Sequence, residues 1–437
     1  MSASLTYAYE GALPVRAAVE RGGRWLPASR VVLVVTLLLA PLPFGAVLPA
    51  GWASITLGTC AAFLCWVIAS TRRRALGLSF SAAHLAGLGA WLLAAGQLLV
   101  HATGDAVGTR ESLIKLASYL LLMLLASAMF AESGDQWPER LGWMATFYGF
   151  GLSLLSIVQF LSSPGKIYWL ISPRFGGQVF GPYVNHNHYA GLMEMLFPLV
   201  IVHLLQQRRG QARWFLGFSA MLIFASVALC GSRSGLLVLV SEAGVVVAIL
   251  LSWTRRRSVA VMAVVLTIAL GSGMAMWLLP DGARNHLQGA INPRDAGFRE
   301  RRALAMDALR IFRANPALGV GLGSFETAYP RYESFPTDYT IDHAHNDYAE
   351  FLAETGIAGG LLLLVGLSSF LRCAWQNLRI QAPSPHDWLR LGASIACGGL
   401  LLHSFSDFNL HIPANAAWFA FCAGIAMTTH TVPRPVR

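Results

Sequence analysis

The sequence predicts an all-α fold: a polytopic integral membrane protein with about twelve transmembrane helices and one large outer loop that contains helices. Of its 437 residues, 55% are hydrophobic and only 12% are charged, whereas soluble domains carry about 25% charged residues. Apolar runs of roughly 20 residues, the length that crosses about 30 Å of hydrocarbon, recur along the whole chain. A soluble globular protein is thereby excluded.

The side of the membrane on which each loop lies follows from the arginines. Clusters of arginine occur in "TRRR" (71–74), "QQRRGQAR" (206–213), "TRRRS" (254–258) and the terminal "RPVR". With twelve spans these clusters all fall on one side, which the positive-inside rule makes cytoplasmic. This placement accounts for the net charge of +10 without nucleic acid as a partner. The spans are expected at about 31–48, 52–70, 81–100, 114–131, 141–162, 188–206, 214–230, 235–253, 258–279, 357–374, 388–406 and 414–430.

The chain is organised as one membrane domain with a single large insertion. Residues 1–30 and 431–437 are expected to be cytoplasmic, and the N-terminal stretch lacks the apolar core of a cleavable signal peptide. Spans one to nine occupy 31–279 and spans ten to twelve occupy 357–430. The polar segment 280–356 therefore lies on the outer side, as a large periplasmic loop if the protein is bacterial.

Two elements are expected inside this loop. Apolar residues at helical spacing predict an amphipathic helix over about 297–314. The proline and glycines of "NPALGVGLGSF" then break the helix. A nucleotide-binding loop would follow a strand and precede a lysine, and these glycines do neither. They therefore predict a tight turn.

A histidine begins the last part of the loop, in "HNDYAEFLAETGIAG". Asn346 to Glu354 is expected to form a helix that leads into span ten, with His345 at its N-terminal end. Because an imidazole has an unperturbed pKa near 6.5, His345 is suited to take a proton from a hydroxyl group, and Asp342 is the carboxylate expected to orient it. The glycines Gly356 and Gly359 are expected to let a neighbouring span approach closely. The alternative is an interfacial histidine that contacts only water or lipid headgroups.

Outer-face arginines form the second candidate group. Arg233 lies in the turn "CGSRSG" (230–235) between spans seven and eight, and its guanidinium group can bind phosphate through two hydrogen bonds. Arginine on this side runs against the positive-inside trend, which favours a ligand. The alternative is that the side chains reach lipid headgroups. The other outer-face arginines are Arg174, Arg299, Arg301 and Arg302.

A third polar group lies at the start of span six, in "PYVNHNHYAG" (182–191). His186 and His188 are two residues apart and do not share a helix face, and the six cysteines show no zinc-ligand spacing. We therefore expect no metal, and instead contacts of Asn185, His186 and His188 with sugar hydroxyls. Between the last two spans, Asp407 is expected either to pair with an outer-face arginine or to reach water.

These features together predict a donor with phosphates, an acceptor with a hydroxyl group and a base between them, all at the outer leaflet. A sugar linked to a lipid pyrophosphate has this chemistry.

The same residues resemble a known family. His345-Asn346, nine residues and then Gly356-x-x-Gly359 are similar to a signature of bacterial O-antigen ligases. "SRSG" (232–235) resembles the arginine turn of that family, and "SDFNLHIPANA" resembles its late motif. The resemblance covers roughly residues 180–430 and the twelve-span layout. Ala305 departs from the pattern, because relatives often carry an aromatic residue there.

The resemblance implies a function and roles for residues. It implies an enzyme of lipopolysaccharide biosynthesis in the bacterial inner membrane, with its site on the periplasmic face and no cofactor. This glycosyltransferase would transfer O-antigen from undecaprenyl pyrophosphate to a sugar of lipid A-core, without a metal and with inversion. His345 would be the general base, and Arg233 with Arg301 or Arg302 would hold the pyrophosphate. Arg174, Asn346 and Asp407 would also contact substrate.

Other functions stay open. The superfamily includes O-antigen polymerases and protein O-oligosaccharyltransferases, so the resemblance does not fix the acceptor. A transporter of lipid-linked glycans would belong to a different class, and it would show inverted repeats and ionisable residues at mid-membrane. The sequence shows no repeats, and its polar groups are expected to cluster at one face.

Overall fold

The computed structural model describes residues 23–74, 78–134, 136–173, 178–207, 210–253, 296–380 and 383–428, with four single residues between 254 and 295. These described ranges form helices and loops and contain two isolated β-bridges but no β-strand. The prediction of an all-α fold is confirmed for this part of the chain.

Eleven of the twelve expected spans fall on described helices, and the expected span 258–279 lies almost wholly outside the described residues. Among the described helices, 8 are long and apolar enough to cross a membrane. These eight are α3 (Pro49–Arg73), α4 (Ala82–Leu99), α5 (Ala106–Ala131), α6 (Gln136–Ser162), α7 (His186–Gln206), α8 (Ala212–Cys230), α9 (Arg233–Trp253) and α14 (Asp347–Leu378). The other three are α2 (Trp25–Leu39), α15 (Pro385–His403) and α16 (Pro413–Ala426).

The first span is shorter than expected. Helix α2 ends at Leu39 rather than near residue 48, because Pro41 and Pro43 follow and cannot donate helical hydrogen bonds. A short 3₁₀ helix, η1 (Phe44–Ala46), then turns the chain into α3.

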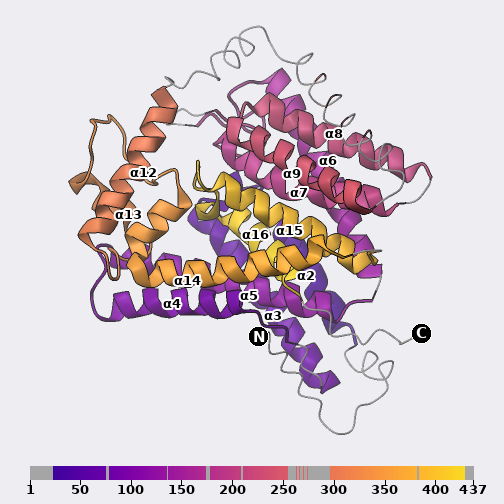
Figure 1. Cartoon of the computed structure of the whole chain (residues 1–437), viewed down its shortest axis with the longest axis horizontal. Helices are drawn as coiled ribbons and strands as arrows, with labels where there is room; N and C mark the ends of the chain where they lie inside the picture. The colour runs from indigo at the N-terminus through magenta and orange to yellow at the C-terminus, as the bar shows by residue number, and fades with distance from the viewer. Residues whose placement is uncertain are drawn as a thin grey trace.

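Helix α7 lies at the centre of the helical bundle. Its most apolar window is 94% buried inside the protein, against 17% for that of α14. Helix α15 packs against α7 and α9, and α16 packs against α5. In Figure 1, α15 and α16 accordingly lie between the group α6 to α9 and the layer that contains α3, α4, α5 and α14.

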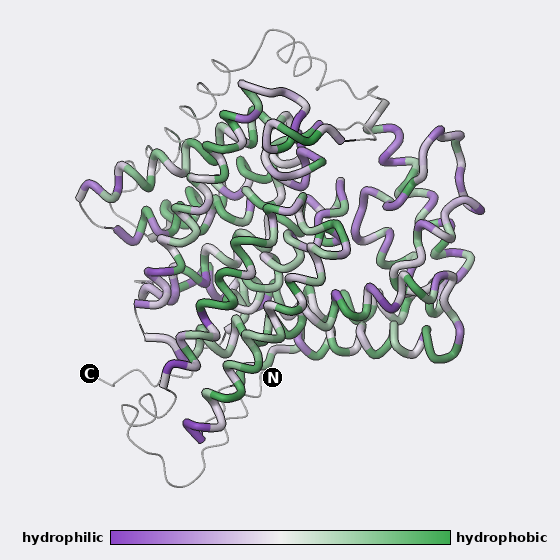
Figure 2. Tube along the Cα trace, turned by 180° about the vertical axis from the view of Figure 1, so that it is seen from behind, coloured by the Kyte–Doolittle hydropathy of each residue, from purple (hydrophilic) through white to green (hydrophobic). Residues whose placement is uncertain are grey.

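The described part of the segment expected to form the outer loop has a hydrophobic core of its own. Helix α12 (Ala296–Ala314) confirms the amphipathic helix expected at 297–314. Its residues Leu304, Ala308 and Ile311 pack against α13 (Phe325–Ala328) and the 3₁₀ helix η2 (Tyr329–Arg331). Figure 2 shows hydrophilic residues gathered over this part, whereas the long helices are mainly hydrophobic.

The segment 296–331 packs on the start of α14. The turn after α12 packs on the helix where Gly356 interrupts it with a φ of 63°, and Ile357 N–H donates to the Pro316 carbonyl at 2.8 Å. A side chain at Gly356 would collide with the backbone of Ala317. Gly356 therefore admits the turn after α12, and the prediction that it admits a neighbouring span is wrong. The atoms nearest to a Cβ built at Gly359 belong to Thr355 and Phe351 of the same helix, so the role of Gly359 stays a prediction.

Candidate functional site

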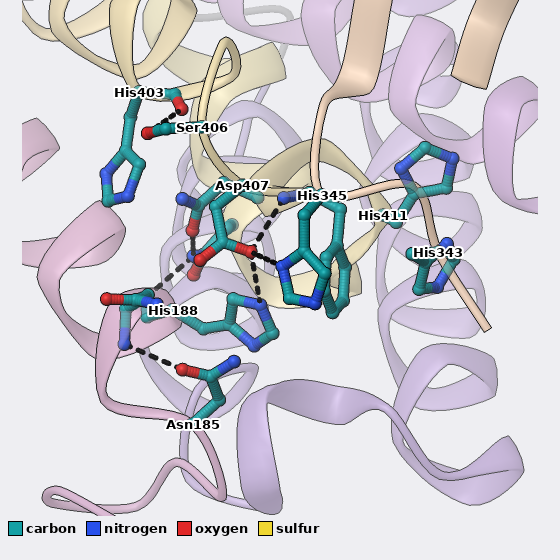
Figure 3. A network of polar contacts seen from close by, with 12 residues as sticks. Asn185, His188, His343, His345, His403, Ser406, Asp407 and His411 are labelled. Carbon is teal, nitrogen blue, oxygen red and sulfur yellow. Dashed lines mark hydrogen bonds and ion pairs between the residues drawn. The ribbon is translucent and has the colours of Figure 1, made fainter. Parts of the chain in front are cut away.

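His345 stands immediately before α14, in a backbone conformation that few residues adopt. Its φ of 48° lies in the left-handed region, which costs a non-glycine residue roughly 1–2 kcal/mol. Asn346 then caps the helix, because its side-chain oxygen accepts the N–H of Tyr348 at 3.1 Å and that of Ala349 at 3.0 Å. The His345 imidazole thus leaves the helix and points to the loop between α15 and α16 (Figure 3).

The carboxylate that His345 meets in this loop is Asp407. His345 Nδ1 lies 3.1 Å from Asp407 Oδ1, and the Asp407 side chain is fully buried. The expectation that Asp342 orients His345 is wrong: Asp342 is exposed. Asp407 is a better partner because burial protects its hydrogen bond from competition with water.

Two more side chains converge on Asp407 from other helices. His188 Nε2 of α7 lies 3.7 Å from Oδ1, and Arg301 Nη2 of α12 lies 3.7 Å from Oδ2. Of the two expected environments of Asp407, an arginine partner or water, the structure shows the arginine partner. Three segments of the chain therefore meet at one buried carboxylate, and Figure 3 shows His188 and His345 on either side of Asp407.

Asp407 stays ionised because its neighbours outweigh its burial. Burial alone would raise the pKa of its carboxyl group, but the contacts with His188 and His345 and the charge of Arg301 hold that pKa well below its usual range. An ionised Asp407 favours the His345 tautomer with its proton on Nδ1, which leaves the lone pair on Nε2. His345 can then accept a proton at Nε2.

The predicted arginines differ in their position. Arg301 reaches the cluster and also donates to the Ser406 carbonyl at 3.1 Å, whereas Arg302 and Arg299 are exposed on the same helix. Arg233 is exposed at the start of α9, next to Ser234, whose hydroxyl group accepts from Ser406 Oγ at 2.8 Å. The start of α9 therefore lies beside the Asp407 loop. Arg174 lies outside the described residues.

The polar residues at the start of α7 have separate partners. Asn185 caps the helix by accepting the Asn187 N–H at 2.9 Å, and His186 Nδ1 lies 2.8 Å from the Cys230 carbonyl at the end of α8. Only His188 of this group contacts Asp407. Substrate contact by Asn185 and His186 stays a prediction.

A second histidine cluster, which the sequence analysis missed, adjoins the first. His343 Nδ1 lies 2.7 Å from Glu350 Oε1, and His411 lies between Glu350 and Asp347. The rings of His343 and His345 lie 4.4 Å and 4.8 Å from that of Phe408. The alternating histidines of "HAHND" and the histidine of "DFNLH" were the available signal.

Within the described ranges, this second cluster is the one place where at least three histidine, cysteine, aspartate or glutamate side chains lie close enough together to bind one metal ion. One atom each of His343, Glu350 and His411 lie within 4.8 Å of one another. However, His411 Nδ1 lies 2.8 Å from Asp347 and Nε2 lies 3.3 Å from Glu350. Burial would lower the pKa of His411, but the Glu350 charge and the Asp347 hydrogen bond raise it to about 10. A protonated imidazole thus satisfies both carboxylates.

Ionisable residues also lie inside the helical bundle, where the sequence analysis expected none. His403 Nδ1 of α15 lies 2.8 Å from Glu194 Oε1 of α7, and both side chains are fully buried. Glu242 of α9 is also buried. The expectation that polar groups cluster at one face alone is therefore wrong. Glu194 and Glu242, each a charged residue within an apolar run, were the available signal in the sequence.

Comparison with known proteins finds a match for the central part of the chain. Residues 195–364, which run from within α7 through α8, α9 and α12 to the first half of α14 and include His345, match the family model described as O-antigen ligase. A comparison with curated proteins gives no match. The matched region contains both Arg301 on α12 and His345 immediately before α14. Over these residues, this multi-pass membrane protein is similar to the O-antigen ligase family.

Proposed function

We propose that the protein is an O-antigen ligase. It transfers O-antigen polysaccharide from undecaprenyl pyrophosphate to a sugar hydroxyl group of lipid A-core, at the periplasmic face of the bacterial inner membrane. The observation that carries this proposal is the hydrogen-bonded pair of His345 and Asp407, 3.1 Å apart and next to Arg301.

The His345–Asp407 pair suits a general base. Asp407 orients the imidazole and stabilises the positive charge that develops on it, as the aspartate does in hydrolytic triads. His345 Nε2 removes the proton of the acceptor hydroxyl group as its oxygen attacks the anomeric carbon. A new glycosidic C–O bond forms while the bond from that carbon to the pyrophosphate breaks.

The arginines suit the leaving group. The electron pair of the broken bond stays on the pyrophosphate, whose developing charge two guanidinium groups stabilise. We assign this role to Arg301 of α12, which lies 3.7 Å from Asp407, and to Arg233 at the start of α9. Direct attack inverts the anomeric configuration, and arginine supplies the positive charge without a metal ion.

The acceptor separates this proposal from its nearest alternatives. An O-antigen polymerase would use a second lipid-linked glycan, and a protein oligosaccharyltransferase would use a protein hydroxyl group. All three need a basic pocket and a base.

Deletion of the gene, followed by analysis of both glycan pools, tests the acceptor. A ligase deletion is expected to leave long polymer on undecaprenyl pyrophosphate and lipid A-core without O-antigen. Complementation with the wild-type gene should restore O-antigen on lipid A-core. Lipid A-core that carries single repeat units would identify a polymerase, and unchanged lipid A-core together with a lost glycoprotein would identify a protein transferase.

A further inference from the structure

Several hydrogen bonds join the first turn of α14 to the loop between α15 and α16. Asp347 N–H donates to the Ser404 carbonyl at 3.0 Å. The Asp347 carboxylate accepts the Ser404 hydroxyl at 2.6 Å and the Leu410 N–H at 3.2 Å. Asn346 adds a side-chain hydrogen bond to the Phe405 carbonyl at 2.9 Å. The two segments are therefore held at a fixed separation.

His411 is the centre of this attachment. Its Nδ1 lies 2.8 Å from Asp347 Oδ1 and its Nε2 lies 3.3 Å from Glu350 Oε1. Asp347 and Glu350 are 5% and 1% exposed, so their charges would be costly without a cation. The protonated imidazole supplies that cation, and it links Asp347 and Glu350, three residues apart on α14, to the loop.

The same two segments carry the proposed base and its partner. His345 lies two residues before Asp347, and Asp407 lies four residues before His411. His345 also holds a left-handed backbone conformation, which persists only where the surroundings enforce it. The separation of His345 and Asp407 therefore depends on the contacts of His411 with α14.

We propose that Asp347, His411 and Glu350 form a positioning triad that holds His345 in line with Asp407 and with the acceptor hydroxyl group. The triad touches no reacting atom. It acts by fixing the first turn of α14 against the 404–411 loop. Its catalytic consequence rests on the proposed function, whereas its effect on the setting of His345 does not.

The substitution that tests the triad is His411→Gln, which removes the charge and one of the two links. Since misplacement of a catalytic group by about 1 Å can cost 10²-fold, we expect kcat to fall by about tenfold or more. KM should change by less than about twofold, because the triad does not bind substrate. Ser404→Ala, which removes one hydroxyl group, should give a smaller loss in the same direction and serves if His411→Gln does not fold.

Comparison with Asp407→Asn separates positioning from general destabilisation. Both substitutions disturb the setting of His345, so the double variant should be little slower than the slower single variant. If the fold-loss in kcat of the double variant equals the product of the two single losses, the proposal is overturned. His386→Gln is the matched control, because His386 bonds Ser133 at 2.9 Å at the other end of α15 and should leave kcat unchanged.

A second measurement does not depend on transfer. Diethyl pyrocarbonate modifies accessible imidazoles, and mass spectrometry follows His345 alone. We expect faster modification of His345 in His411→Gln than in the wild type and in His386→Gln. An unchanged rate would overturn the triad. If the wild type fails to transfer glycan while the modification rates differ as expected, the proposed function fails and the positioning triad stands.

Discussion

Alanine at position 345 is expected to lower glycan transfer by about 10²–10⁴-fold, the usual contribution of general acid–base catalysis. The reason is that His345 is the imidazole bonded to the buried Asp407, so its loss removes the only base that this account assigns. Asp407→Asn should also be slow, because an amide does not stabilise the imidazolium. The measurement is kcat/KM with purified variants, a lipid-linked glycan donor and lipid A-core.

A matched control is His101→Ala. His101 is exposed in the loop between α4 and α5, and this loop is expected on the same side of the membrane as His345. It should transfer glycan at the wild-type rate. If His345→Ala loses less than about tenfold, well under the range of base catalysis, the mechanism is wrong.

The second large effect is expected at Arg301. Removal of one group that stabilises developing negative charge typically lowers kcat by about 10²–10³-fold, and Arg301→Ala should show a loss of this size. Arg302→Ala is the neighbouring control and should have little effect, since Arg302 is exposed on the same helix. Arg301→Lys should fall between them, because lysine keeps the charge without the planar pair of donors.

Arg233 is expected to follow the same order, with Arg233→Lys impaired and Arg233→Ala impaired further. A full loss in Arg302→Ala with normal transfer in Arg301→Ala would move the pyrophosphate site along α12. Wild-type activity of Arg233→Ala would exclude the start of α9 from that site.

The sequence predicts the parts of the molecule that depend on local patterns. Apolar runs predict the long helices because backbone groups in hydrocarbon must bond within their own segment. The helix at 297–314 and the N-terminal position of His345 follow from periodicity and helix signals in the same way. The predicted end of the first span was wrong because Pro41 and Pro43 end α2 at Leu39.

The pairing of charged groups could not be predicted from such patterns. Asp342 is three residues from His345, whereas the observed partner, Asp407, is 62 residues away. Only the packing of α14 beside the loop after α15 brings that carboxylate to the imidazole. The contact of His411 with Asp347 has the same origin, since it spans 64 residues.

The central claim is that His345 and the arginines carry out a direct, metal-independent transfer from a lipid pyrophosphate. The most direct test is a reaction of the purified protein with a lipid-linked glycan of known anomeric configuration and lipid A-core, in excess EDTA. Nuclear magnetic resonance of the new glycosidic bond gives its configuration. We predict transfer at the full rate with inverted configuration. Loss of activity in EDTA that one divalent ion restores, or a retained configuration, would contradict it.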